Sequence, residues 1–397
     1  MFPIKDIQDR VIAFGGRVLD DSKPKYINSP ENIVYSKGRQ LFGLNVAKKS
    51  GSNKIIIVEG YMDAISLYQR GITNVVASLG TALTEAQGRL LRKYSNQIIM
   101  GYDADGAGQA AIMRGMEILS SMGCDIRILQ LDGDAKDPDE YIIKYGSGRF
   151  EKCVENAISL VEFKVKSLKK DLIIQTALNL LDLPINKSNM DMLGFIHHPF
   201  FNSIFIPYKD EFIDIRKDTS KFKNCVNELK EHIKSENSVS DIMLHITQPY
   251  QLLFFSLIED YLDEQTFATL LKECYTKTEF PNCDVNVPVE DIREMFKTAN
   301  KTLLMDADEV EIFNKLDNEL TIYRGFYSNE YYDALSWTLD YDKAHFFARR
   351  FNNTKGSIFQ ANIKKDDIYA YFECRNEKEI IVDYTKLYNI TKKVQFD

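Results

Sequence analysis

Short runs of apolar residues alternate with amphipathic segments between residues 54 and 131. The apolar runs are Ile55–Val58, Val75–Leu79, Ile98–Tyr102 and Ile126–Leu131. Each run has the length of one strand, and the segments between them have the length and polarity of helices. Strands that are apolar on both faces are typical of a parallel sheet covered by helices. The sequence therefore predicts an α/β domain made of βαβ units.

Carboxylates follow two of these runs at the points where the strands should end. Glu59 comes directly after Val58, and Asp103 and Asp105 come directly after Tyr102. The carboxyl ends of parallel strands meet at one edge of a sheet, where ligands bind. Hard oxygen ligands are what Mg2+ prefers, and clustered carboxylates hold the metal ions of phosphoryl transfer. We therefore expect a metal site at this edge.

A third acidic segment contains Asp137 and Asp139 and follows one further apolar run. A purely structural alternative remains open for these acids. Asp103 and Asp105 would then only cap the next helix, and the segment from Asp137 to Asp139 would only form a turn.

The composition is that of a globular chain. With 397 residues it should form two or three domains, and 44% hydrophobic and 27% charged residues are ordinary values. We expect a cytoplasmic protein without a membrane partner, because no apolar run approaches the roughly 20 residues of a membrane span and no signal peptide is recognisable. The six cysteines are scattered, so neither a zinc site nor a disulfide framework is indicated.

The first 50 residues should form short strands and loops, with turns at Gly15-Gly16, Lys23-Pro24 and Ser29-Pro30. Basic side chains outnumber acidic ones in this segment, although the whole chain carries a net charge of −8. A polyanionic partner would therefore meet this part of the chain.

The rest of the chain changes character twice. A helical stretch is expected from about Arg149 to Leu180, followed by a junction at residues 182–187. Residues 219–315 should be mainly helical. Residues 320–388 should return to strands, with one helix at Lys343–Phe351.

Four motifs in the first part of the chain resemble one known family. They are Glu59-Gly60-Tyr61-Met62-Asp63, Ser78-Leu79-Gly80-Thr81-Ala82, Tyr102-Asp103-Ala104-Asp105-Gly106-Ala107-Gly108 and Asp137-Pro138-Asp139. Together they look like the Toprim core of bacterial replicative DNA primases. The stretch from Phe2 to Arg39 resembles the segment just upstream in those enzymes, so the resemblance covers about residues 1–175.

This resemblance implies a Mg2+- or Mn2+-dependent nucleotidyl transferase that acts on nucleotides and a single-stranded DNA template. Glu59 would be a general acid/base or a metal ligand. The other metal ligands would be Asp103, Asp105, Asp137 and Asp139. Five basic residues would face template or nucleotide phosphates: Arg10, Arg17, Lys25, Lys37 and Arg39. For each of these five, an ordinary surface role remains the alternative.

The sequence also departs from that family. It shows no zinc-binding module, no first half of the polymerase domain and no helicase-binding domain. We therefore expect metal and nucleotide binding to be retained more readily than template capture and primer initiation.

A second group of polar residues lies near the C-terminus. Arg324-Gly325 begins one expected strand, Ser336 and Thr338 lie on another, and Glu377 and Glu379 precede a third. These could be three unrelated strand edges. However, they resemble the Arg / Ser-x-Thr / Glu-x-Glu signature of arginine-directed mono-ADP-ribosyltransferases, in the version found in phage-encoded proteins.

This second resemblance implies an α+β domain that uses NAD+ as ADP-ribose donor and a protein arginine as acceptor. Glu379 would stabilise the oxocarbenium-like state, and Glu377 would orient or deprotonate the acceptor. Arg324, with Gly325, would bind NAD+ through its phosphate. Ser336 and Thr338 would brace the Glu379 carboxylate and the nicotinamide pocket, with a plain strand role as the alternative for Thr338.

The expected organisation has five segments. They are a basic remnant of the primase polymerase domain (1–50), the Toprim domain (51–150), a helical exit and linker (151–187), a mainly helical region (188–315) and an ADP-ribosyltransferase-like catalytic domain (316–397). Both halves could be active, or only one of them. In a third, non-enzymatic hypothesis the Toprim half is inert and the other half is a binding module.

Overall fold

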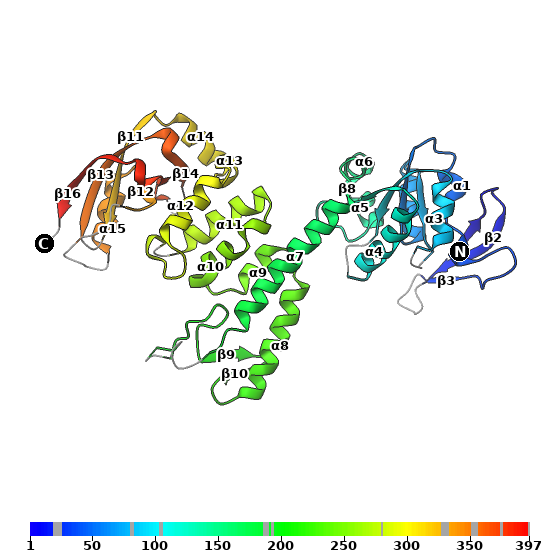
Figure 1. Ribbon diagram of the computed structural model, residues 1–397, viewed down its shortest axis with the longest axis horizontal. Helices are drawn as coiled ribbons and strands as arrows, with labels where there is room; N and C mark the ends of the chain where they lie inside the picture. The colour runs from blue at the N-terminus through cyan, green and yellow to red at the C-terminus, as the bar shows by residue number, and fades with distance from the viewer. Residues whose placement is uncertain are drawn as a thin grey trace. The chain divides into compact units, whose positions relative to one another are not determined.

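The computed structural model describes residues 1–18, 26–79, 83–102, 106–185, 190–191, 194–278, 281–326, 333–350, 356–373 and 376–395. The chain divides into two compact units, Met1–Ser167 (unit 1) and Leu168–Asp397 (unit 2), and Figure 1 labels their elements. The first boundary lies within the predicted helical exit. The five-segment division itself stays a prediction.

Unit 1 begins with a small antiparallel sheet. Its strands are β1 (Phe2–Lys5), β2 (Val11–Arg17) and β3 (Tyr26–Asn28), in that order. The turn predicted at Gly15-Gly16 is wrong, because both glycines lie inside β2. A Cβ at Gly15 would lie 2.8 Å from the Tyr61 ring, so the glycine here permits an aromatic ring to pack against the strand.

The main sheet of unit 1 has the order β5-β4-β6-β7-β8. Its strands are β4 (Lys54–Val58), β5 (Val75–Ala77), β6 (Gln97–Gly101), β7 (Asp125–Ile128) and β8 (Ile158–Ser159). The first four pair in parallel, which confirms the predicted α/β fold with a parallel sheet, whereas β8 pairs antiparallel to β7.

Both faces of this sheet are buried. Ile56 and Val58 of β4 belong to one hydrophobic cluster, and Ile55 and Ile57 belong to another. Successive side chains of a strand point to opposite faces, so an uninterrupted apolar run is what two covered faces require. The accompanying helices are α1 (Leu44–Ala47), α2 (Tyr61–Gln69), α3 (Glu85–Arg92), α4 (Gly106–Ser121), α5 (Pro138–Tyr145) and α6 (Ser147–Glu155), with a 3-10 turn η1 at Lys37–Arg39 (Figure 1).

The predicted helical stretch from Arg149 to Leu180 is interrupted. Helix α6 ends at Glu155, and helix α7 (Leu160–Leu181) begins only after β8. The cause is Ile158, which is buried and pairs with Ile128 at the edge of the sheet.

Unit 2 starts with a hairpin and a series of helices, as predicted for residues 219–315. The hairpin is β9 (Phe205–Tyr208) and β10 (Glu211–Asp214). The helices are α8 (Thr219–Ser235), α9 (Val239–Leu244), α10 (Gln248–Ile258), α11 (Glu264–Lys277), α12 (Val289–Thr298), α13 (Lys301–Leu304) and α14 (Ala307–Lys315), with 3-10 turns η3 (Glu259–Tyr261) and η4 (Pro281–Cys283).

An antiparallel sheet completes unit 2, in the order β14-β15-β12-β11-β13-β16. Its strands are β11 (Glu319–Phe326), β12 (Ser336–Thr338), β13 (Ser357–Lys364), β14 (Ile368–Phe372), β15 (Glu379–Val382) and β16 (Tyr388–Gln395). The 3-10 turns η6 (Lys365–Asp367) and η8 (Tyr384–Lys386) lie between strands, and helix α15 (Tyr341–Ala348) packs against β11.

One hydrophobic cluster joins the helices of unit 2 to its sheet. Phe254 and Phe296 from the helices and Trp337 and Phe372 from the strands are all buried in it. The Phe296 and Phe372 ring centroids are 6.4 Å apart. The helical region and the sheet are therefore stabilised by the same core.

Among the described residues, we find no helix whose length and apolar character would let it cross a bilayer.

Candidate functional sites

Glu59 lies where the sequence predicted it, directly after β4 at the carboxyl edge of the unit 1 sheet, and is partly buried. Four residues later, Asp63 connects two helix starts at the same edge. Its Oδ2 accepts a hydrogen bond from the Gly60 amide (3.1 Å), and its Oδ1 accepts one from the Asp139 amide (3.3 Å). Because Asp63 holds both amides, the segments that contain Glu59 and Asp139 lie side by side.

The third acidic segment also has a structural role. Asp137 is the N-cap of α5, and its Oδ1 accepts a hydrogen bond from the Glu140 amide (2.7 Å). Pro138 occupies the first helical position, where its missing amide is not needed. The Asp139 carboxylate accepts a hydrogen bond from the Ser66 hydroxyl. Asp137 therefore caps a helix, whereas the structural alternative had placed it in a turn, and capping is compatible with a second role for the same carboxylate.

Tyr102 places the end of β6 next to Glu59. Burial raises the pKa of Tyr102 to about 12, with a further increase from the negative charge of Glu59 and an opposing effect of Ser78. The parallel register of β4 and β6, with Val58 opposite Gly101, places Tyr102 and Glu59 at the same sheet edge. The predicted ligands Asp103 and Asp105 follow Tyr102 in sequence but lie outside the described residues.

The part of the chain that the structure describes contains no group of three or more His, Cys, Asp or Glu side chains that could hold a metal ion. Glu59, Asp137 and Asp139 therefore do not form a complete site by themselves. Their oxygen donors fit the chemistry of Mg2+. The metal site stays a prediction, and it depends on Asp103 and Asp105.

The predicted phosphate-facing residues Lys37 and Arg39 lie on η1, which is fixed to α3. The Thr84 hydroxyl donates to the Gly38 carbonyl (2.5 Å), and the Gln87 amide donates to the Lys37 carbonyl (2.9 Å). Gln87 is completely buried. These contacts give the Lys37–Arg39 turn a defined position.

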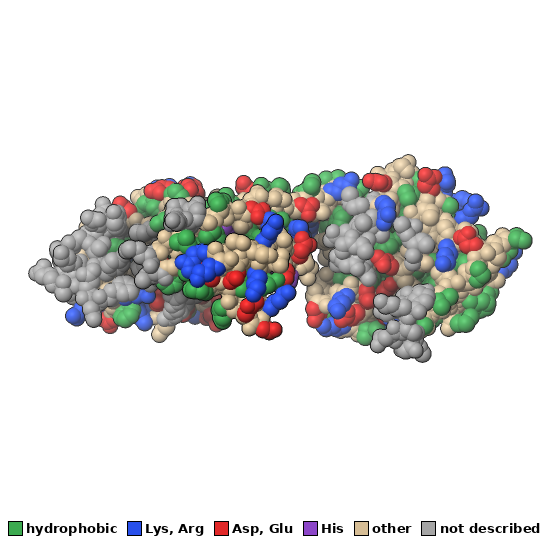
Figure 2. All heavy atoms as spheres, turned by 90° about the horizontal axis from the view of Figure 1, so that it is seen from below, with side chains coloured by type: hydrophobic (Ala, Val, Ile, Leu, Met, Phe, Trp, Pro, Cys, Tyr) green, Lys and Arg blue, Asp and Glu red, His purple; other side chains and the backbone are tan. Residues whose placement is uncertain are grey.

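Of the other three predicted phosphate-facing residues, the structure describes two. Arg10 forms an ion pair with Asp6 at 2.7 Å, Arg17 is exposed on β2, and Lys25 lies outside the described residues. On the face of unit 1 in Figure 2, basic and acidic side chains are interspersed. The nucleic-acid role of these residues stays a prediction.

The second group of predicted residues lines one cavity in unit 2, with a volume of about 160 Å³. Its lining includes Arg324 and Gly325 from β11, Ser336 and Thr338 from β12, Glu379 from the start of β15, and Glu377 from the segment just before it. These residues are separated by up to 55 positions in the sequence, and the antiparallel order β15-β12-β11 brings them together. The alternative of three unrelated strand edges is therefore wrong.

A chain of hydrogen bonds crosses these three strands. The Arg324 guanidinium donates to the Ser336 carbonyl (2.5 Å), and the Ser336 hydroxyl donates to Glu379 Oε1 (2.5 Å). Short bonds from a hydroxyl to a carboxylate are charge-assisted and strongly directional. Ser336 thus holds the Glu379 carboxylate, as the sequence predicted.

Thr338 acts differently from Ser336. Its hydroxyl donates to the Glu377 carbonyl (2.8 Å) and accepts from the Asp340 amide (3.0 Å). Thr338 therefore fixes the backbone of the Glu-x-Glu turn, whereas the prediction had it brace the Glu379 carboxylate. The residue between the two glutamates, Lys378, has a left-handed backbone with φ of 46°.

Gly325 lines the cavity, but its strictest requirement comes from packing. A Cβ at this position would lie 1.6 Å from the Ala344 carbonyl oxygen and 2.8 Å from the Ala348 nitrogen. Only glycine lets α15 approach β11 this closely.

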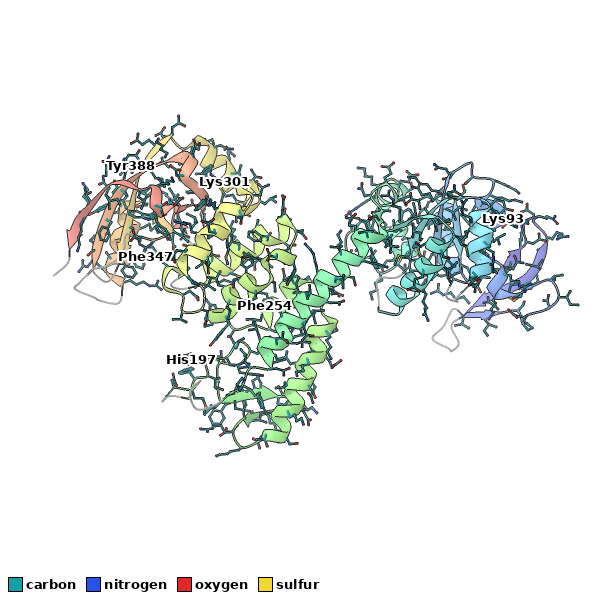
Figure 3. The ribbon with its side chains drawn as sticks, viewed as in Figure 1. Lys93, His197, Phe254, Lys301, Phe347 and Tyr388 are labelled. Atoms are coloured by element: carbon teal, nitrogen blue, oxygen red, sulfur yellow. The ribbon has the colours of Figure 1, made fainter. Side chains whose placement is uncertain are left out.

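The cavity lining also includes residues that were assigned no role from the sequence, among them Tyr275, Asn282, Phe347 and Arg350. Phe347 belongs to α15 and is labelled in Figure 3. Tyr275 lies on α11, and Asn282 on η4 accepts a hydrogen bond from the Leu335 amide (3.0 Å). Neither Tyr275 nor Asn282 belongs to a motif, and only the fold places them beside the strands.

The parallel sheet of unit 1 agrees with the comparisons with known families. Residues 56–142 match the Toprim-like family, and residues 1–48 match the N-terminal domain of the DNA primase catalytic core. Unit 1 is therefore a Toprim-like α/β domain similar in sequence to the catalytic core of DNA primases.

The relatives include the DNA primase of Clostridium acetobutylicum, 55% identical over 166 residues that make up 42% of this chain and 28% of the primase. The DNA primase of Escherichia coli K12 is 42% identical over 181 residues, which are 44% of this chain and 31% of the primase. The chain thus spans less than a third of the length of these two relatives.

Solved structures of primase catalytic cores show a similar sequence identity over a similar share of this chain. One is a DnaG primase catalytic domain bound to single-stranded DNA, 44% identical, covering 42% of this chain and 54% of that chain with a TM-score of 0.40. Another is the Escherichia coli primase catalytic core, 41% identical, covering 46% and 61% with a TM-score of 0.41.

Proposed function

We propose that the chain joins a DNA primase-like Toprim domain to an NAD+-dependent, arginine-directed ADP-ribosyltransferase domain of phage type. For the transferase half, one observation carries the proposal. All six residues that the motif resemblance assigns to NAD+ and to the acceptor arginine line a single cavity.

The cavity residues suit the cleavage of NAD+. Arg324 offers a planar guanidinium for the diphosphate. The bond between the ribose C1′ and nicotinamide breaks, nicotinamide leaves with the bonding electrons, and positive charge develops on the ribose. The Glu379 carboxylate stabilises that charge, and its orientation by Ser336 means that no reorganisation is needed in the transition state.

Transfer then requires an acceptor nucleophile. A guanidinium nitrogen of the acceptor arginine attacks C1′ and forms the new bond, and its proton passes to Glu377. Thr338 supports this step because it fixes the backbone of Glu377. Glu377 and Glu379 thus take separate roles, one toward the acceptor and one toward the ribose.

Incubation of the full chain with cell lysate and NAD+ labelled in its adenylate phosphate tests the transferase. We expect a labelled protein with the wild type and none with Glu379→Ala. The matched control is Glu311→Ala, which removes a carboxylate on α14 that is 67% exposed and forms an ion pair with Lys315 at 2.5 Å. Equal labelling by wild type and Glu379→Ala, or none by either, would remove the claim.

For unit 1, the proposal is Mg2+- or Mn2+-dependent nucleotidyl transfer on single-stranded DNA. Its support is the similarity to DNA primases together with the meeting of the Glu59 and Asp137–Asp139 segments at one sheet edge. The metal would neutralise phosphate charge and polarise the reacting oxygens. Lys37 and Arg39, on their fixed turn, would contact further phosphates.

Primer synthesis on single-stranded DNA, with Mg2+ or Mn2+, tests this half. We expect activity from the wild type to be lost in Asp103→Ala, and equal activity in the two proteins would contradict the proposal. If only the labelling assay is positive, the alternative applies in which the Toprim domain is an inert nucleic-acid tether. If only primer synthesis is positive, the chain is a primase-like nucleotidyltransferase.

A further inference from the structure

The helical region of unit 2 contributes one fully buried polar group to the cavity. Tyr275 on α11 is only 1% exposed, and it lines the cavity opposite the strands. Its ring packs edge-on against Phe296, with centroids 4.9 Å apart and an interplanar angle of 89°. The ring is therefore held in the core beside the cavity, and its hydroxyl is buried.

The neighbours of this hydroxyl are the residues of the proposed reaction. Burial raises the pKa of Tyr275 well above its usual value, and Glu379 adds to the effect, whereas Arg324 and Ser336 oppose it. The phenol is therefore protonated at every physiological pH and is available as a hydrogen-bond donor.

The donor is not satisfied by the described protein groups. Ser336 is a close neighbour, but the Tyr275 hydroxyl makes no hydrogen bond of acceptable geometry, and the Ser336 proton is already donated to Glu379. Buried polar groups nearly always have a partner, so an unpartnered hydroxyl on a residue that lines a cavity points to a ligand atom.

We propose that Tyr275 is a substrate-binding residue whose hydroxyl donates a hydrogen bond to the nicotinamide-side ribose of NAD+. This inference rests on the proposed transferase function. The ribose is the chosen partner because Tyr275 adjoins Glu379, the residue assigned to the charge that develops on that ribose. A ribose hydroxyl can accept from Tyr275 while it donates to a carboxylate.

The helical region of unit 2 and its sheet both contribute residues to the cavity. The sheet alone supplies the residues of the recognised motif, but α11 and η4 supply Tyr275 and Asn282 to the same cavity. The helical region is then part of the substrate site and not a separate module.

The test compares the full-length wild type with Tyr275→Phe, which keeps the ring and removes the hydroxyl. Binding of ADP-ribose and of ADP is measured, together with KM and kcat for NAD+ cleavage. Loss of one hydrogen bond should weaken ADP-ribose binding and raise the KM by about 10-fold. ADP, which lacks the second ribose, should bind equally to both proteins, and kcat should change by less than about threefold because Glu379 is retained.

The control is Tyr369→Phe, which removes another buried tyrosine hydroxyl in unit 2, at 7% exposure, from a residue that does not line the cavity. Tyr369→Phe should bind ADP-ribose and ADP with the same affinities as the wild type. Thermal unfolding verifies that each variant is folded, and Tyr275→Met replaces Tyr275→Phe if the latter is not.

The outcomes separate the two claims. If the wild type neither binds nor cleaves NAD+, the proposed function fails. If the wild type is active and Tyr275→Phe has an unchanged KM and unchanged ADP-ribose affinity, the inference alone is overturned. It is also overturned if only kcat falls, because Tyr275 would then act through Ser336 and Glu379 without touching the ribose.

Discussion

The two candidate sites are assembled from the chain in different ways. In unit 1 the acidic residues follow strands of a parallel sheet, and the fold itself delivers strand ends to a common edge. In unit 2 the site lies across three antiparallel strands, with a helix from a distant part of the chain as its other wall. The site in unit 1 therefore depends on where strands end. The site in unit 2 depends on how closely strands and helices from separate parts of the sequence pack.

Gly325→Ala tests the dependence on close packing in unit 2, and of the substitutions considered it should have the largest effect on stability. The added Cβ would lie 1.6 Å from a backbone oxygen of α15, and backbone cannot rotate away as a side chain can. We expect a loss of about 3 kcal/mol or more in the free energy of unfolding of unit 2, at the upper end of overpacking effects. Chemical denaturation of the full chain, followed by the fluorescence of the single residue Trp337 in the unit 2 core, measures it.

The matched control is Gly148→Ala on α6 of unit 1, where a Cβ would meet nothing within 4 Å. This substitution should be neutral or slightly stabilising. A Gly325→Ala protein as stable as the wild type would show that α15 can move, and the contrast between packing-dependent and edge-dependent sites would weaken.

The same contrast explains what could be predicted from the sequence. The apolar runs around Ile56 and Ile99 predicted a parallel sheet correctly, because strands buried on both faces leave an unmistakable pattern. The pattern also placed Glu59 correctly at the sheet edge. Gly15 was mistaken for a turn residue, because its local sequence does not reveal that the Tyr61 ring packs against it.

For unit 2 the motif residues were found by resemblance, but the wall of the cavity was not. Tyr275 precedes Arg324 by 49 residues and lies in an ordinary amphipathic helix. Nothing local distinguishes it from a core tyrosine such as Tyr141. Its role depends on the shared core that places α11 against the strands, and a single sequence does not encode that in any short pattern.

Ser336→Ala should give the next largest effect, because it removes the hydroxyl that orients Glu379 and leaves the strand intact. A charge-assisted hydrogen bond contributes about 1.5 to 3 kcal/mol, so NAD+ cleavage should fall by about 10- to 100-fold in kcat. Thr338→Val is the comparison, because it acts on the Glu377 backbone. It should impair transfer to protein more than cleavage by water. Equal effects of the two variants on both reactions would show that the two glutamates do not have separate roles.

Asp63→Asn tests whether the Asp63 carboxylate holds the Glu59 and Asp139 segments together in unit 1. The carboxylate accepts from two amides, and an amide side chain can accept from only one of them, so one buried donor loses its partner. We expect a loss of about 1 kcal/mol, seen as faster hydrogen exchange at the starts of α2 and α5. Asp134→Asn, on an exposed carboxylate paired with Lys144, should leave exchange in α2 unchanged. If Asp63→Asn also leaves it unchanged, the Glu59 and Asp139 segments are held together by other contacts.

Asp9→Asn should have the smallest effect on stability, and the size of that effect should depend on pH. The carboxylate forms hydrogen bonds with the Lys49 ammonium (2.6 Å) and the Asn45 amide (2.7 Å), and these lower the pKa of Asp9 from 3.8 to about 2. Because the pKa is lower in the folded state, the stabilisation is complete above pH 4 and is lost as the pH falls from about 4 to about 2. The left-handed backbone of Asp9, with φ of 65°, suits asparagine equally well, so the substitution removes charge without adding strain. Hydrogen exchange in the turn between β1 and β2 should be faster in Asp9→Asn than in the wild type at pH 6, after correction for the intrinsic rate. The two proteins should converge near pH 2, and a constant difference between pH 6 and pH 2 would mean that the ion pair to Lys49 does not stabilise the turn.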